Sequence, residues 1–260
     1  MSTTRLRLIT FNIAHGRGLT PIQGVTSARK IRANLLKIAH LMQELKPDVV
    51  ALQEIDQCSR WAGNFDHLEF LRHHMRFPHA VFGITNRREG LLNLCYGNAV
   101  LSRHPILESE SIVFGQRRIG EKGFLYVELD VHGHHVPLIN LHLHYRSREH
   151  RFRQLDQLMD WLMLKHRAHG PRWRMPPLVC GDFNTPRTNT DATASLHRHL
   201  DKYAVYAVHP QHGHTFPSPW PQRALDFIFL PAACHHVREE IVPVMLSDHR
   251  PVQVDFTFGH

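Results

Sequence analysis

Polar side chains stand at the ends of short apolar stretches in six places along the chain. Each stretch is rich in Val, Ile, Leu or Phe and typical of a buried β-strand. The polar residues at these ends are Asn12, Glu54, His142, Asp182 with Asn184, Asp226, and Asp248 with His249. A single carboxylate at such a position is usually a helix cap or a paired core group, because burial without a partner is costly. Six ends that carry only Asn, Glu, His and Asp instead indicate a shared site, since functional groups collect at one edge of an open sheet.

The chemistry that these residues suggest is metal-assisted. Carboxylate oxygens and an Asn carbonyl suit a hard cation, Mg²⁺ or Mn²⁺. The absence of cysteine from the set argues against zinc. Two imidazoles and surplus carboxylates remain to activate a water molecule and to stabilise a phosphate.

An α/β arrangement is predicted to position these groups. Residues 5–12 alternate like a strand, residues 28–45 form an amphipathic helix capped by Ser27 and ended by Pro47, and residues 49–52 form a buried strand. Further strands are predicted at 97–103, 124–131, 136–142, 178–180, 225–230 and 252–258, with a second helix at 148–166. Segments 59–95 and 183–222 are predicted to be irregular and to form the substrate-facing loops.

One domain covering residues 1–260 is the simplest organisation, because no repeat or linker-like segment divides the chain. No apolar stretch approaches the roughly 18 residues of a membrane span. The N-terminus lacks the pattern of a signal peptide, so we expect a cytoplasmic location. Cys58, Cys95, Cys180 and Cys234 are widely separated and predict free, buried thiols.

The formal net charge of +8 favours polyanionic partners such as nucleic acid, anionic lipid headgroups or phosphorylated metabolites. A generally basic surface without a dedicated partner is the alternative, and charge alone does not choose. The chain also has 24 histidines, several in close pairs. Most pairs lie in polar segments, which favours surface positions over metal binding.

Seven short motifs resemble those of the endonuclease/exonuclease/phosphatase superfamily, and they occur in the family's order. They are residues 10–13 (TFNI), 50–54 (VALQE), 97–103 (GNAVLSR), 140–143 (NLHL), 181–184 (GDFN), 225–229 (LDFIF) and 247–249 (SDH). Each motif alone is weak, but together they cover nearly the whole chain. Residues 215–221 (TFPSPWP) look like those of compact bacterial members of this superfamily.

The resemblance implies a four-layered α/β sandwich of two mixed sheets flanked by helices. It implies that Glu54 holds the metal with Asn12 nearby, and that Asp248 supports the site or a second metal. Asp182 would orient the attacking water and help hold the metal, and Asn184 would touch the scissile phosphate. His142 would donate to a phosphate oxygen, and Asp226 would fix the tautomer of His249. The resemblance leaves open whether His249 or Asp182 accepts the proton.

Three functions remain in competition. A phosphodiesterase acting on nucleic acid fits the positive charge, and the arginines at 146, 148, 151 and 153 could steer such a substrate or form a solvated helix face. A phospholipase C-like enzyme, sphingomyelinase-like enzyme or small-molecule phosphatase would suit aromatic side chains in segment 59–95, which could otherwise be core residues. These aromatic residues are Trp61, Phe65, Phe70, Phe77 and Phe82. A catalytically inactive binding protein is the third alternative, and the complete set of site residues argues against it.

Overall fold

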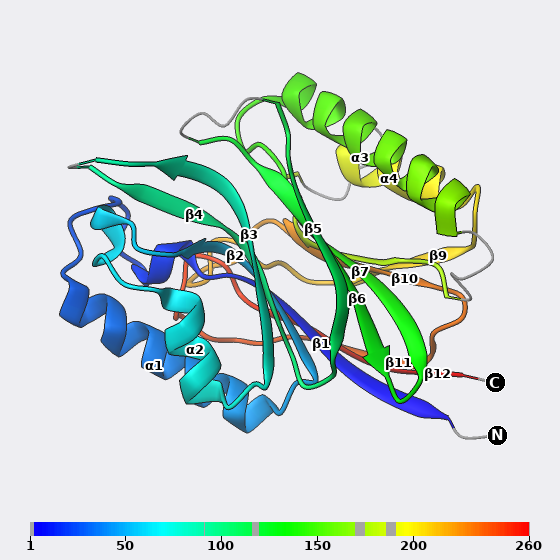
Figure 1. The fold of residues 1–260 in the computed structure, drawn as a ribbon, viewed down its shortest axis with the longest axis horizontal. Helices are drawn as coiled ribbons and strands as arrows, with labels where there is room; N and C mark the ends of the chain where they lie inside the picture. The colour runs from blue at the N-terminus through cyan, green and yellow to red at the C-terminus, as the bar shows by residue number, and fades with distance from the viewer. Residues whose placement is uncertain (1–2, 91, 116–119, 170–174, 186–190, 260) are drawn as a thin grey trace.

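Two six-stranded sheets form the centre of the molecule, and helices cover the outer face of each sheet (Figure 1). The structure, a computed structural model, describes residues 3–90, 92–115, 120–169, 175–185 and 191–259. In spatial order, the first sheet contains β11 (His235–Ile241), β12 (Val252–Phe258), β1 (Thr4–Asn12), β2 (Val49–Asp56), β4 (Leu94–Ser102) and β3 (His79–Arg88). The second contains β5 (Ile106–Val113), β6 (Gly123–Val131), β7 (His134–His142), β8 (Leu178–Asp182), β10 (Asp226–Pro231) and β9 (Tyr206–His209). The helices are α1 (Ala28–Leu45), α2 (His67–Met75), α3 (Arg148–His169) and α4 (Ala192–Leu200), with short 3-10 turns η1 (Ala14–Gly16) and η2 (Arg60–Ala62).

Three apolar clusters hold the layers together. One lies between the two sheets and includes Leu8, Leu138 and Val254. A second joins α1 and α2 to the outer face of the first sheet, and a third joins α3 and α4 to the outer face of the second (Figure 1). The expected four-layered sandwich of two mixed sheets flanked by helices is therefore confirmed.

Helix α1 forms where the sequence predicts it. The Ser27 side chain accepts a hydrogen bond from the backbone N–H of Lys30, which caps the first turn. The helix ends at Leu45 because Lys46 adopts a left-handed conformation and Pro47 lacks the N–H needed to continue.

Two pairs of neighbouring strands are parallel, β1 with β2 and β7 with β8. A parallel pair brings the carboxyl ends of both strands to the same edge of the sheet. Asn12 is thereby aligned with Gln53, and His142 with Asp182. The topology thus brings predicted site residues from distant parts of the chain to one end of the sandwich.

The prediction that segments 59–95 and 183–222 are irregular is wrong. The first contains α2 and β3, and the second contains α4 and β9. The sequence pattern also fails to predict β5 and β11. These four strands are the edge strands of the two sheets. Edge strands carry charged and polar side chains that obscure the apolar alternation, as in HHVREEI of β11.

The aromatic residues of segment 59–95 pack on the helix-covered face of the first sheet. Phe77 is buried there, and Phe65, Phe70 and Phe82 pack against the same cluster. For these four residues the core-packing alternative is confirmed.

The cysteines are free thiols, and Cys95, Cys180 and Cys234 are buried as expected. Cys58 is exposed, so the prediction is wrong at that position, which lies in the loop after β2. Over the part of the chain that the structure describes, no helix has both the length and the hydropathy needed to cross a membrane.

Candidate active site

Four predicted site residues extend the inter-sheet face of their strands. Side chains alternate between the two faces of a strand, so residues two apart share a face. The series are Leu6, Leu8, Thr10 and Asn12 on β1; Leu138, Asn140 and His142 on β7; Leu178, Cys180 and Asp182 on β8; and Leu230, Ile228 and Asp226 on β10. The site residues that end these series are buried. The apolar layer between the sheets therefore becomes polar at one end of the sandwich.

Buried amides form the floor of this polar region. Gln53 Nε2 donates to Asn140 Oδ1 at 2.7 Å and to Thr10 Oγ1 at 3.0 Å. Asn140 Nδ2 donates to the backbone carbonyls of Leu52 and Ala99, both at 2.9 Å. Because Asn140 belongs to the second sheet and its partners to the first, these bonds tie the two sheets together beneath the site.

Glu54 reaches the site through an irregularity in β2. In a regular strand it would share the outer face with Leu52, which packs against the helices. The pairing with β4 shifts register between Leu52 and Ile55, and Glu54 has a φ of 51°. This bulge redirects the carboxylate, and the left-handed backbone costs about 1–3 kcal/mol. Asn184 has the same φ of 51°, so two predicted site residues carry backbone strain.

Asp182 lies at the centre of the group. It is aligned with His142 on one neighbouring strand and with Asp226 on the other. Its Oδ2 lies 2.9 Å from Asn12 Nδ2, 3.2 Å from Asn184 Nδ2 and 3.3 Å from His142 Nε2. Its Oδ1 accepts from the backbone N–H of Asn184 at 2.9 Å. Burial raises the pKa of Asp182, and the nearby Asp226 carboxylate also raises it.

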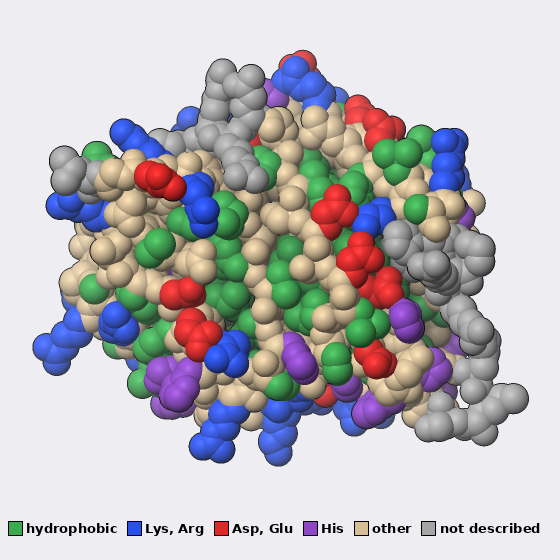
Figure 2. All heavy atoms as spheres, in the orientation of Figure 1, with side chains coloured by type: hydrophobic (Ala, Val, Ile, Leu, Met, Phe, Trp, Pro, Cys, Tyr) green, Lys and Arg blue, Asp and Glu red, His purple; other side chains and the backbone are tan. Residues whose placement is uncertain are grey.

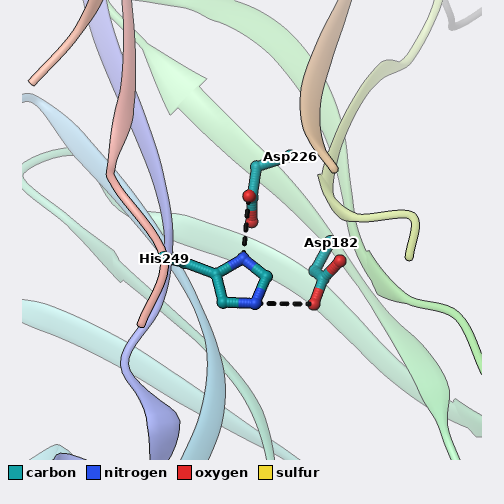
Figure 3. A group of neighbouring side chains, drawn as sticks. All are labelled: Asp182, Asp226 and His249. Atoms are coloured by element: carbon teal, nitrogen blue, oxygen red, sulfur yellow. Dashed lines mark hydrogen bonds and ion pairs between the residues drawn. The ribbon is translucent and has the colours of Figure 1, made fainter. Parts of the chain in front are cut away.

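His249 lies between two carboxylates (Figure 3). Its Nδ1 is 2.8 Å from Asp226 Oδ2, and its Nε2 is 3.8 Å from Asp182 Oδ2 (Figure 3). Burial opposes a charge on the imidazole, but the carboxylates of Asp226 and Asp182 outweigh it and raise the pKa of His249 to about 10. Within the described residues, these three form the one group of potential metal-ligating side chains whose ligand atoms all lie within 4.8 Å of one another.

Two basic side chains flank Glu54. Lys122 Nζ lies 3.3 Å from Oε1, and His15 Nε2 lies 3.5 Å from Oε2. Behind His15, Asp56 accepts from the imidazole Nδ1 at 2.6 Å and from Trp61 Nε1 at 2.9 Å. Burial disfavours a charged Glu54, but the cations, Lys122 foremost, hold its pKa well below the usual range.

Asp248 is held at the margin of the group. Its Oδ2 accepts from Arg17 at 3.0 Å, and its side chain is 32% exposed. The neighbouring Ser247 donates to the backbone carbonyl of Asn12 at 2.7 Å, which anchors residues 247–249 against the end of β1. The structure therefore brings seven of the predicted residues into one connected group and places Asp248 beside it, through the Ser247 hydroxyl, which also lies 3.2 Å from Asp248 Oδ1.

A family model described as "Endonuclease/Exonuclease/phosphatase family" matches residues 9–249, a range that includes every predicted site residue. The chain belongs to this family. The family resemblance expected from the motifs is thereby confirmed.

Similar proteins and solved structures match most of the chain. "Uncharacterized protein YbhP" of Escherichia coli K12 is 28% identical over 235 residues, which cover 85% of this chain and 87% of the relative. A solved endonuclease/exonuclease/phosphatase from Beutenbergia cavernae is 21% identical with a TM-score of 0.74, covering 98% of this chain and 72% of that chain. Sphingomyelinase C from Streptomyces griseocarneus is 21% identical with a TM-score of 0.70, and the match covers 97% of this chain and 99% of that chain. Truncated TDP2 from Caenorhabditis elegans is 17% identical with a TM-score of 0.65, and the match covers 98% of this chain and 98% of that chain. At these identities the structures share the fold.

The residues present fit a hard divalent cation. Asp182 offers carboxylate oxygens beside the amide of Asn12, and Glu54 offers a carboxylate whose contact with Lys122 Nζ is 3.3 Å long. Asp226 Oδ1 is buried without a hydrogen-bond partner, which leaves a further carboxylate oxygen unsatisfied. Oxygen-rich sets of this kind favour Mg²⁺ or Mn²⁺.

Several residues of the site escape prediction from the sequence. His15 lies three residues after Asn12, and Asp56 lies two residues after Glu54. This closeness in sequence to predicted site residues was the signal that could have identified them. Lys122 and Arg17 gave no comparable signal, because a single Lys or Arg usually belongs to the solvated surface. Arg151, one of the predicted steering residues, is instead buried and pairs with Asp191 at 3.5 Å, so it has a structural partner.

Proposed function

We propose that this protein is a divalent-metal-dependent hydrolase of phosphate esters, with a nuclease-like phosphodiesterase as the leading form. The observation that carries the proposal is the buried Asp182 carboxylate placed between two imidazoles, His142 at 3.3 Å and His249 at 3.8 Å. A phosphodiester reaction needs a group that orients water and donors that stabilise charge on the phosphate oxygens. This constellation supplies both.

Each residue has a role that follows from its partners. Asp182 orients the attacking water and accepts its proton, since its carboxylate faces both imidazoles. His249 donates from Nε2 to the phosphate, because Asp226 holds its Nδ1 and stabilises the charged ring. His142 and Asn184 contact the phosphate oxygens from the other side, and Nδ2 of Asn184 lies 3.1 Å from Nε2 of His142.

Glu54 is the main metal-holding residue in this proposal, with Asn12, Asp182 and Asp248 contributing to the site or to a second metal. When bound, Mg²⁺ or Mn²⁺ supplies positive charge that polarises the phosphate and lowers the pKa of a bound water. The strained backbone of Glu54 supports this assignment, because such strain is concentrated at functional positions.

Nucleic acid is the leading substrate because the chain carries a net charge of +8. On the face shown in Figure 2, the Lys and Arg side chains lie mainly around the outline. Acidic side chains are scattered over the middle of this face. A basic path for a polyanion must therefore lie elsewhere than the middle of this face.

A lipid phosphodiester is the second candidate substrate. Phe216 packs against His249 with the ring centroids 4.9 Å apart and the ring planes tilted by 54°, and Trp220 of the same loop is 78% exposed. An exposed Trp in the loop that brings Phe216 to His249 suits an apolar substrate or the surface of a membrane.

Hydrolysis assays test the proposal. An aryl phosphodiester, an aryl phosphomonoester, plasmid DNA, RNA and mixed phospholipids are each incubated with Mg²⁺, with Mn²⁺ and with chelator. We expect metal-dependent turnover that falls about 10²–10³-fold in His249→Ala and in Asp182→Ala, while His40→Ala, an exposed histidine on α1, keeps the wild-type rate. Wild-type rates in both site variants would overturn the mechanism.

Glu54→Gln separates metal binding from chemistry. It keeps the size of the side chain but removes the charge, so the Mg²⁺ concentration for half-maximal activity should rise. An unchanged Mg²⁺ titration would refute the assignment of Glu54.

A further inference from the structure

Lys122 is a buried lysine that the roles above leave unused. It lies directly before β6 and is 9% exposed. Its Nζ lies 3.3 Å from Glu54 Oε1 and 3.4 Å from His142 Nδ1. Lysine is almost never buried unless it is paired, so both contacts require an account.

The contact with His142 determines which ring nitrogen carries the proton. An ammonium group has three donors and no acceptor. Nδ1 of His142 must therefore accept from Lys122, because an N–H at that position would face another donor. A neutral imidazole with an acceptor at Nδ1 carries its proton at Nε2.

The surroundings of Nε2 are consistent with this tautomer. Asp182 Oδ2, an acceptor, lies 3.3 Å from Nε2. Asn184 Nδ2 is also close, at 3.1 Å, but its two hydrogens have other acceptors in Leu143 O at 3.0 Å and Asp182 Oδ2 at 3.2 Å. With this tautomer, the Nε2–H of His142 and both hydrogens of Asn184 Nδ2 each have an acceptor.

We propose that Lys122 is a positioning residue that holds His142 as the tautomer protonated at Nε2, so that His142 presents a fixed hydrogen-bond donor to the substrate phosphate. The hydrogen bond from His142 to a phosphate rests on the proposed function, whereas the contact between Lys122 and His142 does not.

The two imidazoles beside Asp182 thereby have opposite characters. Nδ1 of His249 faces the carboxylate of Asp226, an acceptor, so this nitrogen carries a proton. Nδ1 of His142 faces the ammonium group of Lys122, a donor, so this nitrogen carries none. The two histidines therefore differ in the partner that fixes Nδ1.

The test is ¹⁵N NMR of the histidine side chains in the full chain, with the His142 signals assigned by their loss in His142→Gln. In wild type and in Lys122→Arg, we expect a protonated Nε2 and an unprotonated Nδ1, because Arg also only donates. Lys122→Met removes the donor, so Asn184 can turn a hydrogen toward Nε2 and a second tautomer should appear. The kcat for an aryl phosphodiester should fall about 10-fold or more in Lys122→Met and recover in Lys122→Arg.

Lys165→Met is the matched control. Lys165 pairs with Glu108 at 2.6 Å, between α3 and β5, so its loss removes a paired lysine while leaving the His142 signals and kcat unchanged. A proton on Nδ1 in wild type, or an unchanged His142 spectrum in Lys122→Met, would overturn the proposal. A change only in the metal titration of Lys122→Met would show that Lys122 acts on Glu54 alone, which also overturns it. Because NMR needs no turnover, it tests the tautomer of His142 even if no hydrolysis is detected. Failure of the proposed function can therefore be distinguished from failure of this inference.

Discussion

His15 and Asp56 form a buried pair in which the imidazole Nδ1 lies 2.6 Å from the carboxylate Oδ2. The pair is enclosed by aromatic rings, with Trp61 and Tyr96 at centroid distances of 5.2 Å and 5.3 Å from the His15 ring. The other ring nitrogen faces Glu54. Asp56 therefore controls the orientation of the imidazole that flanks the proposed metal-holding carboxylate.

Asp56→Asn should weaken metal binding more than it slows turnover. Both oxygens of Asp56 accept from N–H groups, so an Asn amide must present its NH₂ to His15 or to Trp61. We expect the Mn²⁺ dissociation constant, measured by electron paramagnetic resonance, to rise about 10-fold, with a smaller change in kcat. Glu69→Gln, at an exposed ion pair with Arg72, is the control. Equal Mn²⁺ affinity in wild type and Asp56→Asn would contradict this role.

Asn140→Ala should destabilise the fold. Its three side-chain hydrogen bonds join the two sheets, and their loss removes a buried partner from Gln53 and from the backbone carbonyls of Leu52 and Ala99. We expect the free energy of unfolding to fall by about 2–4 kcal/mol, measured by urea denaturation. Ser109→Ala, at an exposed position on β5, should change it by less than about 0.5 kcal/mol. An equally small effect for Asn140→Ala would contradict the bridging role.

Gly181→Ala should separate the two strands that align His142 with Asp182. A Cβ at Gly181 would lie 1.9 Å from the carbonyl oxygen of Leu141, and the φ of 140° already disfavours a side chain. We expect a loss of about 3 kcal/mol or more in unfolding free energy, and a fall in kcat within the fraction that still folds. Gly133→Ala is the matched control, because it has a φ of 84° but nothing within 4 Å, and should cost about 1–2 kcal/mol. Equal losses in the two variants would show that strand separation plays no part.

Stability in acid should depend on Asp255. Burial raises the pKa of this carboxyl, but the hydrogen bonds and positive charges of Arg7 and Arg5 lower it by more. The net pKa therefore lies below the ordinary value. A carboxyl with a lowered pKa stabilises the fold above the unfolded pKa of about 3.9, and that contribution is lost as the pH falls through the folded pKa. Asp255→Asn should therefore shrink the difference in urea midpoint between about pH 7 and about pH 3. The same difference in both proteins would contradict this.

Much of the candidate site could be predicted because its residues obey the two-residue period of buried strands. Asn12, His142 and Asp182 each follow apolar residues that face the core between the sheets. A local pattern was therefore enough to find them. Their roles as ligands or catalytic groups stay predictions.

Other features could not be read from local patterns. The orientation of Glu54 depends on a bulge whose register is set by pairing with β4. Lys122 enters the site because β6 pairs with β7 and places Gly123 opposite His142. The edge strands escaped prediction because solvent on one side permits polar residues at nearly every position, as in β11.

The pairing of β1 with β12 places Thr4 opposite Phe258, and His249 lies only three residues before β12. A nascent chain whose residues 247–258 are still inside the ribosome therefore lacks β12, one of the two strands that pair with β1. It also lacks His249, one of the two imidazoles beside Asp182. Contacts between such distant positions form late, because closing a long loop costs entropy before the contact can repay it. We expect the chain to acquire its activity in one late step of folding, after β12 docks, and not gradually as it is synthesised.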